Sequence, residues 1–80
     1  MDTLVQKAWE LYQRTAGFRV ETILTAIVWL EEKHRKTPDG KIAMAIALHY
    51  LILALHEDPT VESEIAQEYC ARAARWQVMA

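Results

Sequence analysis

The stretch IAMAIALHYLILAL, residues 42–55, decides the fold of this chain. His49 is its only residue that can carry a charge, so a helix made of it is apolar on every face. Such a helix is about 21 Å long, and a membrane-spanning helix needs about 20 residues. We therefore expect a central helix that other helices bury. Four side chains should lie in that buried part: Leu48, Leu51, Ile52 and Leu55.

Three further segments carry apolar residues at the three- and four-residue spacing of amphipathic helices. They predict helices at about residues 3–15, 19–36 and 59–77. Alanines in the central stretch would let these helices approach it closely, and they stand at positions 43, 45, 47 and 54. The expected fold is all-α, a compact bundle of about four short helices with a central apolar third helix. We expect one domain that covers residues 1–80.

Two segments with proline are expected to separate the last three helices. The sequence Thr37-Pro38-Asp39-Gly40 fits a type I turn with Pro38 at its first central position. It also fits a helix start with Thr37 as the N-cap and Pro38 as the first helical residue. In both cases the second and third helices form an antiparallel hairpin. Further on, Asp58 is the expected N-cap of the last helix, with Pro59 following at its first position.

Composition limits the classes of function. Nine Lys and Arg against eleven Asp and Glu give a net charge of −2, so the chain lacks the overall positive field of non-specific nucleic-acid binding. A helix-turn-helix around residues 37–40 fails because its recognition helix would present apolar side chains to the bases. The single cysteine, Cys70, cannot form an intramolecular disulfide, and the first residues do not resemble a signal peptide. We expect a cytoplasmic protein without a membrane segment.

Few residues suggest chemistry. Glu31 and His34 have the Glu-x-x-His spacing of di-iron bundles, but no second copy of that motif occurs. His49 and His56 share one helix face, and the simpler interpretation is that His49 forms hydrogen bonds within an apolar interface while His56 caps the helix end. Cys70 lies on or beside an apolar stripe, where a thiol is an inert small side chain. We expect no enzyme activity, no metal and no cofactor.

The remaining candidates are binding residues. Trp9, Trp29 and Trp76 belong to a residue type that is enriched in interface hot spots. An acidic face for a basic partner is expected at Glu57, Asp58, Glu62, Glu64 and Glu68. The apolar share of 52% and the absence of a disulfide favour a homodimer, because oligomerisation compensates for a small core.

The function we expect is that of a small non-enzymatic module that regulates or inhibits a larger protein. By analogy of size and class, phages and other mobile elements use compact chains of this kind as inhibitors of host machinery. One alternative is a structural subunit or adaptor of a larger assembly. The other is a nucleic-acid-associated regulator, which the basic cluster between Lys33 and Lys41 would suggest.

Overall fold

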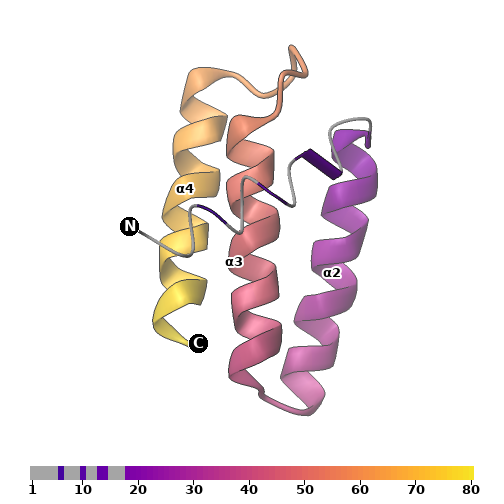
Figure 1. The fold of residues 1–80 in the computed structure, drawn as a ribbon, viewed down its shortest axis with the longest axis vertical. Helices are drawn as coiled ribbons and strands as arrows, with labels where there is room; N and C mark the ends of the chain where they lie inside the picture. The colour runs from indigo at the N-terminus through magenta and orange to yellow at the C-terminus, as the bar shows by residue number, and fades with distance from the viewer. Residues whose placement is uncertain (1–5, 7–9, 11–12, 15–17) are drawn as a thin grey trace.

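The computed structural model of this chain describes residues 6, 10, 13, 14 and 18–80. Three helices lie side by side in one layer: α2 (Val20–Lys36), α3 (Gly40–Leu55) and α4 (Ser63–Val78) (Figure 1). The helix α3 lies in the middle and packs against both neighbours. No strand occurs among these residues, so the predicted all-α class and the central position of the apolar helix are confirmed.

The predicted first helix, at about residues 3–15, lies outside the described residues except at four positions. Gln6, Glu10, Gln13 and Arg14 are helical and exposed. In the part of the chain that the structure describes, three helices are therefore seen where the sequence predicted four over the whole chain. None of these helices is long and apolar enough to cross a membrane.

The core lies where α3 meets its two neighbours. Val20, Ile23 and Ile27 recur at three- and four-residue spacing on α2 and are buried, as this stripe predicted. The helix α3 contributes the largest share, with Ala43, Ile46, Ala47, Tyr50, Ile52 and Leu53 buried. On α4, Ala73 is buried, and its small side chain, like Ala43 and Ala47 on α3, favours a close approach of the helices.

The predicted burial of four α3 side chains is only partly confirmed. Ile52 is buried, and Leu48 and Leu51 are half-buried. Leu55, in contrast, is 51% exposed, so the prediction for it was wrong. Leu55 is the last residue of α3 and lies about 160° around the helix axis from the fully buried Leu53.

The antiparallel hairpin of α2 and α3 is confirmed, but its turn differs from both expectations. Pro38 disfavours helical backbone at the residue before it, and α2 ends at Lys36 with Thr37 as its C-cap. Asp39 has extended backbone, with φ −150° and ψ 128°, which excludes a type I turn centred on Pro38 and Asp39. Its carboxylate accepts a hydrogen bond from the Lys41 backbone N–H at 2.7 Å. Asp39, and not Thr37, is therefore the N-cap of α3.

The predicted N-cap at Asp58 is also wrong. Its carboxylate accepts hydrogen bonds from the Thr60 backbone N–H at 2.9 Å and from the Thr60 hydroxyl at 2.7 Å. These bonds hold the pKa of Asp58 below its ordinary value. The Val61 N–H closes the same turn on the Asp58 carbonyl at 2.9 Å. Asp58 therefore forms an Asx-type turn, and α4 begins later, at Ser63 with Glu62 as its N-cap.

His56 links two segments that meet at the end of the layer near this turn. It is the C-cap residue of α3, as expected. Its Nδ1 accepts a hydrogen bond from the Asp58 N–H at 3.0 Å, so its Nε2 carries the proton and donates to the Phe18 carbonyl at 2.8 Å. The segment that leads into α2 is thereby tied to the α3–α4 connection.

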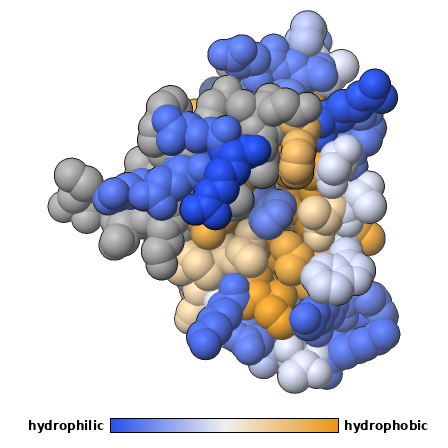
Figure 2. Space-filling view, turned by 45° about the vertical axis from the view of Figure 1, so that its right-hand side comes forward, coloured by the Kyte–Doolittle hydropathy of each residue, from blue (hydrophilic) through white to orange (hydrophobic). Residues whose placement is uncertain are grey.

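Large apolar side chains remain exposed on the described helices. Val28 and Trp29 on α2 are 66% and 62% exposed, and Val78 near the end of α4 is 87% exposed. Figure 2, which turns the α2 side of the layer toward the viewer, shows hydrophobic residues in the middle and hydrophilic residues above and below. Large apolar side chains that remain exposed are candidates for contact with another molecule.

Candidate protein-interaction groove

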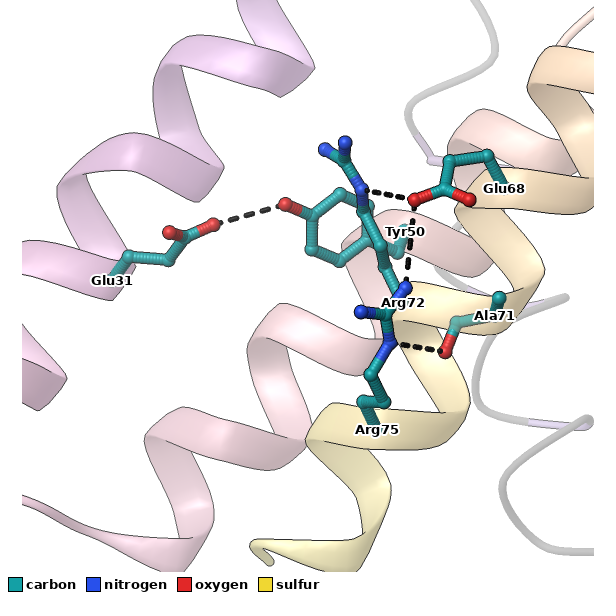
Figure 3. Close-up of polar contacts among 6 residues, drawn as sticks. All are labelled: Glu31, Tyr50, Glu68, Ala71, Arg72 and Arg75. Atoms are coloured by element: carbon teal, nitrogen blue, oxygen red, sulfur yellow. Dashed lines mark hydrogen bonds and ion pairs between the residues drawn. The ribbon is translucent and has the colours of Figure 1, made fainter.

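Tyr50 connects all three described helices through its ring and its hydroxyl group. From α3, the hydroxyl donates a hydrogen bond to the Glu31 carboxylate on α2 at 3.0 Å (Figure 3). The guanidinium carbon of Arg72 on α4 lies 5.8 Å from the centre of the Tyr50 ring. Burial raises the pKa of Tyr50, and the hydrogen bond to Glu31 raises it further. The neutral phenol is therefore held in place as a donor.

Two arginines of α4 are fixed by one carboxylate. Arg72 Nε donates to Glu68 Oε1 at 3.1 Å, and Arg75 Nη2 lies 3.5 Å from the same oxygen (Figure 3). The hydrogen bond to Glu68, followed by the contact with Tyr50, raises the pKa of Arg72. Exposed ion pairs of this kind contribute only about 0.2–1 kcal/mol each to stability. Their main effect here is to hold the two guanidinium groups beside Tyr50.

Trp76 on α4 reaches across to α2. Its ring meets the His34 ring edge to face, with the ring centres 5.2 Å apart and the planes at 88°. Beside this pair is a hollow of about 440 Å³, lined by Val28, Glu31, Glu32, His34, Arg35 and Trp76. A second hollow of about 290 Å³ is lined by Glu31, Tyr50, Arg72, Arg75, Trp76 and Met79. Because both hollows share Glu31 and Trp76, we treat them as one feature, the Trp76 groove between α2 and α4.

The residue types in the Trp76 groove match those that dominate binding energy at interfaces. Trp, Tyr and Arg are enriched among hot-spot residues, and the groove contains Trp76, Tyr50 and three arginines. Its cations already have acidic partners, since Glu32 pairs with Arg35 as Glu68 does with Arg72. The groove therefore offers aromatic surface between charges whose positions are set before a ligand arrives, which lowers the entropy cost of binding.

The structure places the predicted binding residues in different parts of the molecule. Trp76 is half-buried in the groove wall. Trp29 is exposed on another side of α2, with the Lys33 ammonium 5.1 Å from the centre of its ring. Trp9 lies outside the described residues. The three tryptophans therefore do not form one site among the residues that the structure describes.

The predicted acidic face is divided as well. Glu57, Glu62 and Glu64 are exposed and Asp58 is half-buried, all at the end of the layer where α3 stops and α4 starts. Glu68 lies further along α4 and belongs to the arginine network. The acidic residues thus form a group at one end of the layer, and Glu68 is part of the groove network instead.

Sequence reasoning missed the central part of the groove. The sequence alone does not single out Tyr50, and it marks Glu31 only as half of a Glu-x-x-His motif. One signal was present, since a tyrosine in an otherwise apolar buried helix needs a partner for its hydroxyl group. The sequence does not identify that partner, because Glu31 is 19 residues away on another helix.

The candidate metal and catalytic residues have other contacts. His49 Nδ1 lies 2.6 Å from the Ala45 carbonyl, and both ring nitrogens of His56 bond to backbone groups. Over residues 18–80 and the four earlier helical positions, no group of three possible metal ligands occurs. Cys70 is exposed, and none of the hydrogen bonds found within the described part of the chain involves its thiol or the Ser63 hydroxyl.

Comparisons with protein-family models, with curated proteins and with solved structures find no match to this chain. The described part of the chain is therefore characterised by its structure alone. It is an all-α layer with a groove lined by aromatic residues and paired arginines.

Proposed function

We propose that this chain is a small non-enzymatic interaction protein that regulates or inhibits a larger protein by holding a segment of it in the Trp76 groove. The observation that carries the proposal is the lining of the groove, where Trp76 and Tyr50 lie among three arginines. We place this activity in the cytoplasm. By analogy of size and class, we extend the proposal to a regulator encoded by a phage or another mobile element.

The groove favours one kind of bound segment. Val28 and Met79, at its two ends, are exposed apolar side chains, and Trp76 lies between the two hollows. A bound segment would bury an apolar side chain against Trp76 and direct polar groups toward the charged rim. Burying a single Leu or Phe side chain contributes about 1.5–3 kcal/mol to the binding free energy. A segment with two such anchors would gain much of its binding free energy from them.

The non-enzymatic part of the proposal rests on how the reactive groups are placed. A catalytic nucleophile needs a base within hydrogen-bond reach and a group that orients the base. In the described residues His49 and His56 are engaged with backbone groups. The groove carboxylates are engaged as well, since Glu31 accepts the Tyr50 hydroxyl and Glu32 pairs with Arg35. These contacts position a surface for binding rather than a proton for transfer.

Two valines provide a matched test. Val28 lines the groove, whereas Val78 is equally apolar and even more exposed but is not among the groove residues. A photo-cross-linking residue is introduced at either position, and the full chain is expressed in its source cell. We expect one dominant heterologous adduct from position 28 and little from position 78.

The same pair is then used for binding measurements with the protein identified in that adduct. Val28→Glu should weaken the affinity at least about tenfold, because a charge would enter the apolar part of the contact, and Val78→Glu should leave it unchanged. Equal cross-linking from both positions, or equal effects of the two substitutions, would contradict the groove as the docking site.

A further inference from the structure

Two arginines in the α4 wall of the Trp76 groove share a single carboxylate. Arg72 Nε donates to Glu68 Oε1 at 3.1 Å, and Arg75 Nη2 lies 3.5 Å from the same oxygen. The Nε–H of Arg75 reaches the Ala71 carbonyl, also at 3.5 Å. Both contacts of Arg75 are longer than an ordinary N–H···O hydrogen bond. This wall therefore has one positive charge that Glu68 does not balance, and Arg75 is its loosely held cation.

Both guanidinium groups are accessible to a ligand. In Figure 3 the two terminal nitrogens of Arg72 point away from Glu68. The side chains of Arg72 and Arg75 are 47% and 66% exposed. A carboxylate suits such donors because a guanidinium group can bind both of its oxygens at once. The α4 wall thus has the donors and the charge for one further carboxylate.

The opposite wall of the groove, on α2, has the reverse charge balance. Its charged residues are Glu31, Glu32 and Arg35, and Arg35 pairs with Glu32. Glu31 accepts the hydrogen bond of the Tyr50 hydroxyl at 3.0 Å, and Figure 3 shows it on the α2 side of Tyr50, with the two arginines on the α4 side. A cation that approached Glu31 would compete with this hydroxyl, whereas an acid that approached Arg75 would displace only long contacts. The charge complementarity of the groove therefore favours an acid on the α4 wall.

The apolar part of the groove adjoins these two arginines. Four residues of α4 and its C-cap recur at the spacing of one helix face and line the same hollow: Arg72, Arg75, Trp76 and Met79. Arg72 stands one turn before Trp76, a rise of about 5.4 Å. Side chains two residues apart in an extended peptide lie on the same side, about 6.6 Å from each other. An apolar residue and an acid at that spacing would therefore reach the aromatic and the charged part together.

We propose that the segment held in the Trp76 groove is an acidic one, in which an apolar side chain packs against Trp76 and Met79 and the carboxylate of a neighbouring Asp or Glu binds Arg72 and Arg75. The proposal rests on the proposed docking function and adds the chemistry of the partner. A segment with Lys or Arg in place of the acid would bring like charges together on the α4 wall, which selects against it.

The first experiment uses the full chain to select binders from a displayed library of random short peptides. Each selected peptide is assigned to the groove when it cross-links to a photo-reactive residue in place of Val28 but not in place of Val78. We expect the groove peptides to have Asp or Glu within two residues of Leu, Phe or Trp at least about threefold more often than the unselected library. Groove peptides without this enrichment would overturn the acidic segment and leave the docking function intact. A selection without any groove peptide would contradict both.

The second experiment measures the affinity of the groove peptide that cross-links most strongly. Arg75→Gln should weaken it about fivefold, because it removes a partly exposed charge-assisted contact. Arg19→Gln removes the same charge at an exposed position outside the groove and should change the affinity less than about twofold. Unchanged circular-dichroism spectra would show that both variants are folded. Equal effects of the two substitutions would refute the contact with the α4 wall.

Two changes in the peptide complete the test. When its acid is replaced by the corresponding amide, Arg75→Gln should have no further effect, because the two groups act as a pair. An effect of Arg75→Gln that persists with the amide peptide would overturn the proposal. Phosphoserine in place of the acid should raise the affinity by less than about fivefold. A larger gain would assign the two arginines to a phosphate group and overturn the carboxylate.

Discussion

Three leucines of α3 test how this helix sits in the layer. Leu53 is completely buried, Leu51 is half-buried and Leu55 is 51% exposed. Replacing Leu53 by Ala removes three carbon atoms, which costs about 2.4 kcal/mol in transfer free energy, and the cavity left behind raises the loss to about 3–4 kcal/mol. Leu51→Ala should cost about 1–2 kcal/mol because part of its surface already meets water. Leu55→Ala should cost less than about 1 kcal/mol.

The assay is urea unfolding followed by far-ultraviolet circular dichroism, at one low protein concentration so that self-association does not contribute. Equal slopes of unfolding free energy against urea would show that the variants unfold in the same way. If Leu53→Ala does not fold, Ile46→Val replaces it, with an expected loss of about 0.5–1.5 kcal/mol at a fully buried position. A loss at Leu55 as large as the loss at Leu53 would contradict the exposed position of Leu55 at the end of α3.

Three further predictions concern polar contacts. Tyr50→Phe should lower the unfolding free energy by about 1–2 kcal/mol at neutral pH, because it removes the hydrogen bond to Glu31. The folded-state pKa of Tyr50 is raised above 10.0, so its contribution is complete below pH 10 and is lost as the pH rises through the folded value; the difference between the two proteins in urea titrations should shrink there. Asp39→Ala should cost about 1 kcal/mol of thermal stability while Asp39→Ser retains most of it, because serine also caps helices. His56→Ala should make the Asp58 amide exchange its hydrogen faster in NMR experiments, and an unchanged rate would contradict the hydrogen bond to His56.

Local patterns were enough to predict the helices of the described region. The helix α2 was expected from residue 19 and begins at Val20, because its buried stripe is regular and its last turn is basic. The position of α3 followed from its uniform hydrophobicity. Predictions failed where two local signals competed, since Asp58 can cap a helix or close a turn with Thr60. The sequence is compatible with both the cap and the turn. In the structure Asp58 forms the turn, and its N–H donates a hydrogen bond to His56.

The candidate groove was harder to predict because its contacts join residues far apart in the chain. The hydrogen bond of Tyr50 to Glu31 and the ring contact of Trp76 with His34 both bring α2 together with another helix. Periodicity tells which face of a helix is apolar, but it does not tell which polar residues meet across two helices. The tryptophans could be recognised as candidates by type, whereas the placement of Trp76 in the groove and of Trp29 on another side of α2 depends on packing.

The two faces of the layer differ because Tyr50 carries a hydroxyl group. On its side of α3, a buried polar atom requires a partner, and Glu31 and the α4 arginines close over the helix to provide a polar surrounding. On the other side of α3, Ile52 is buried and Leu48 is half-buried, and neither side chain needs a hydrogen-bond partner. A polar, shaped groove favours selective recognition of one foreign segment, because an unmatched ligand leaves its charges unpaired.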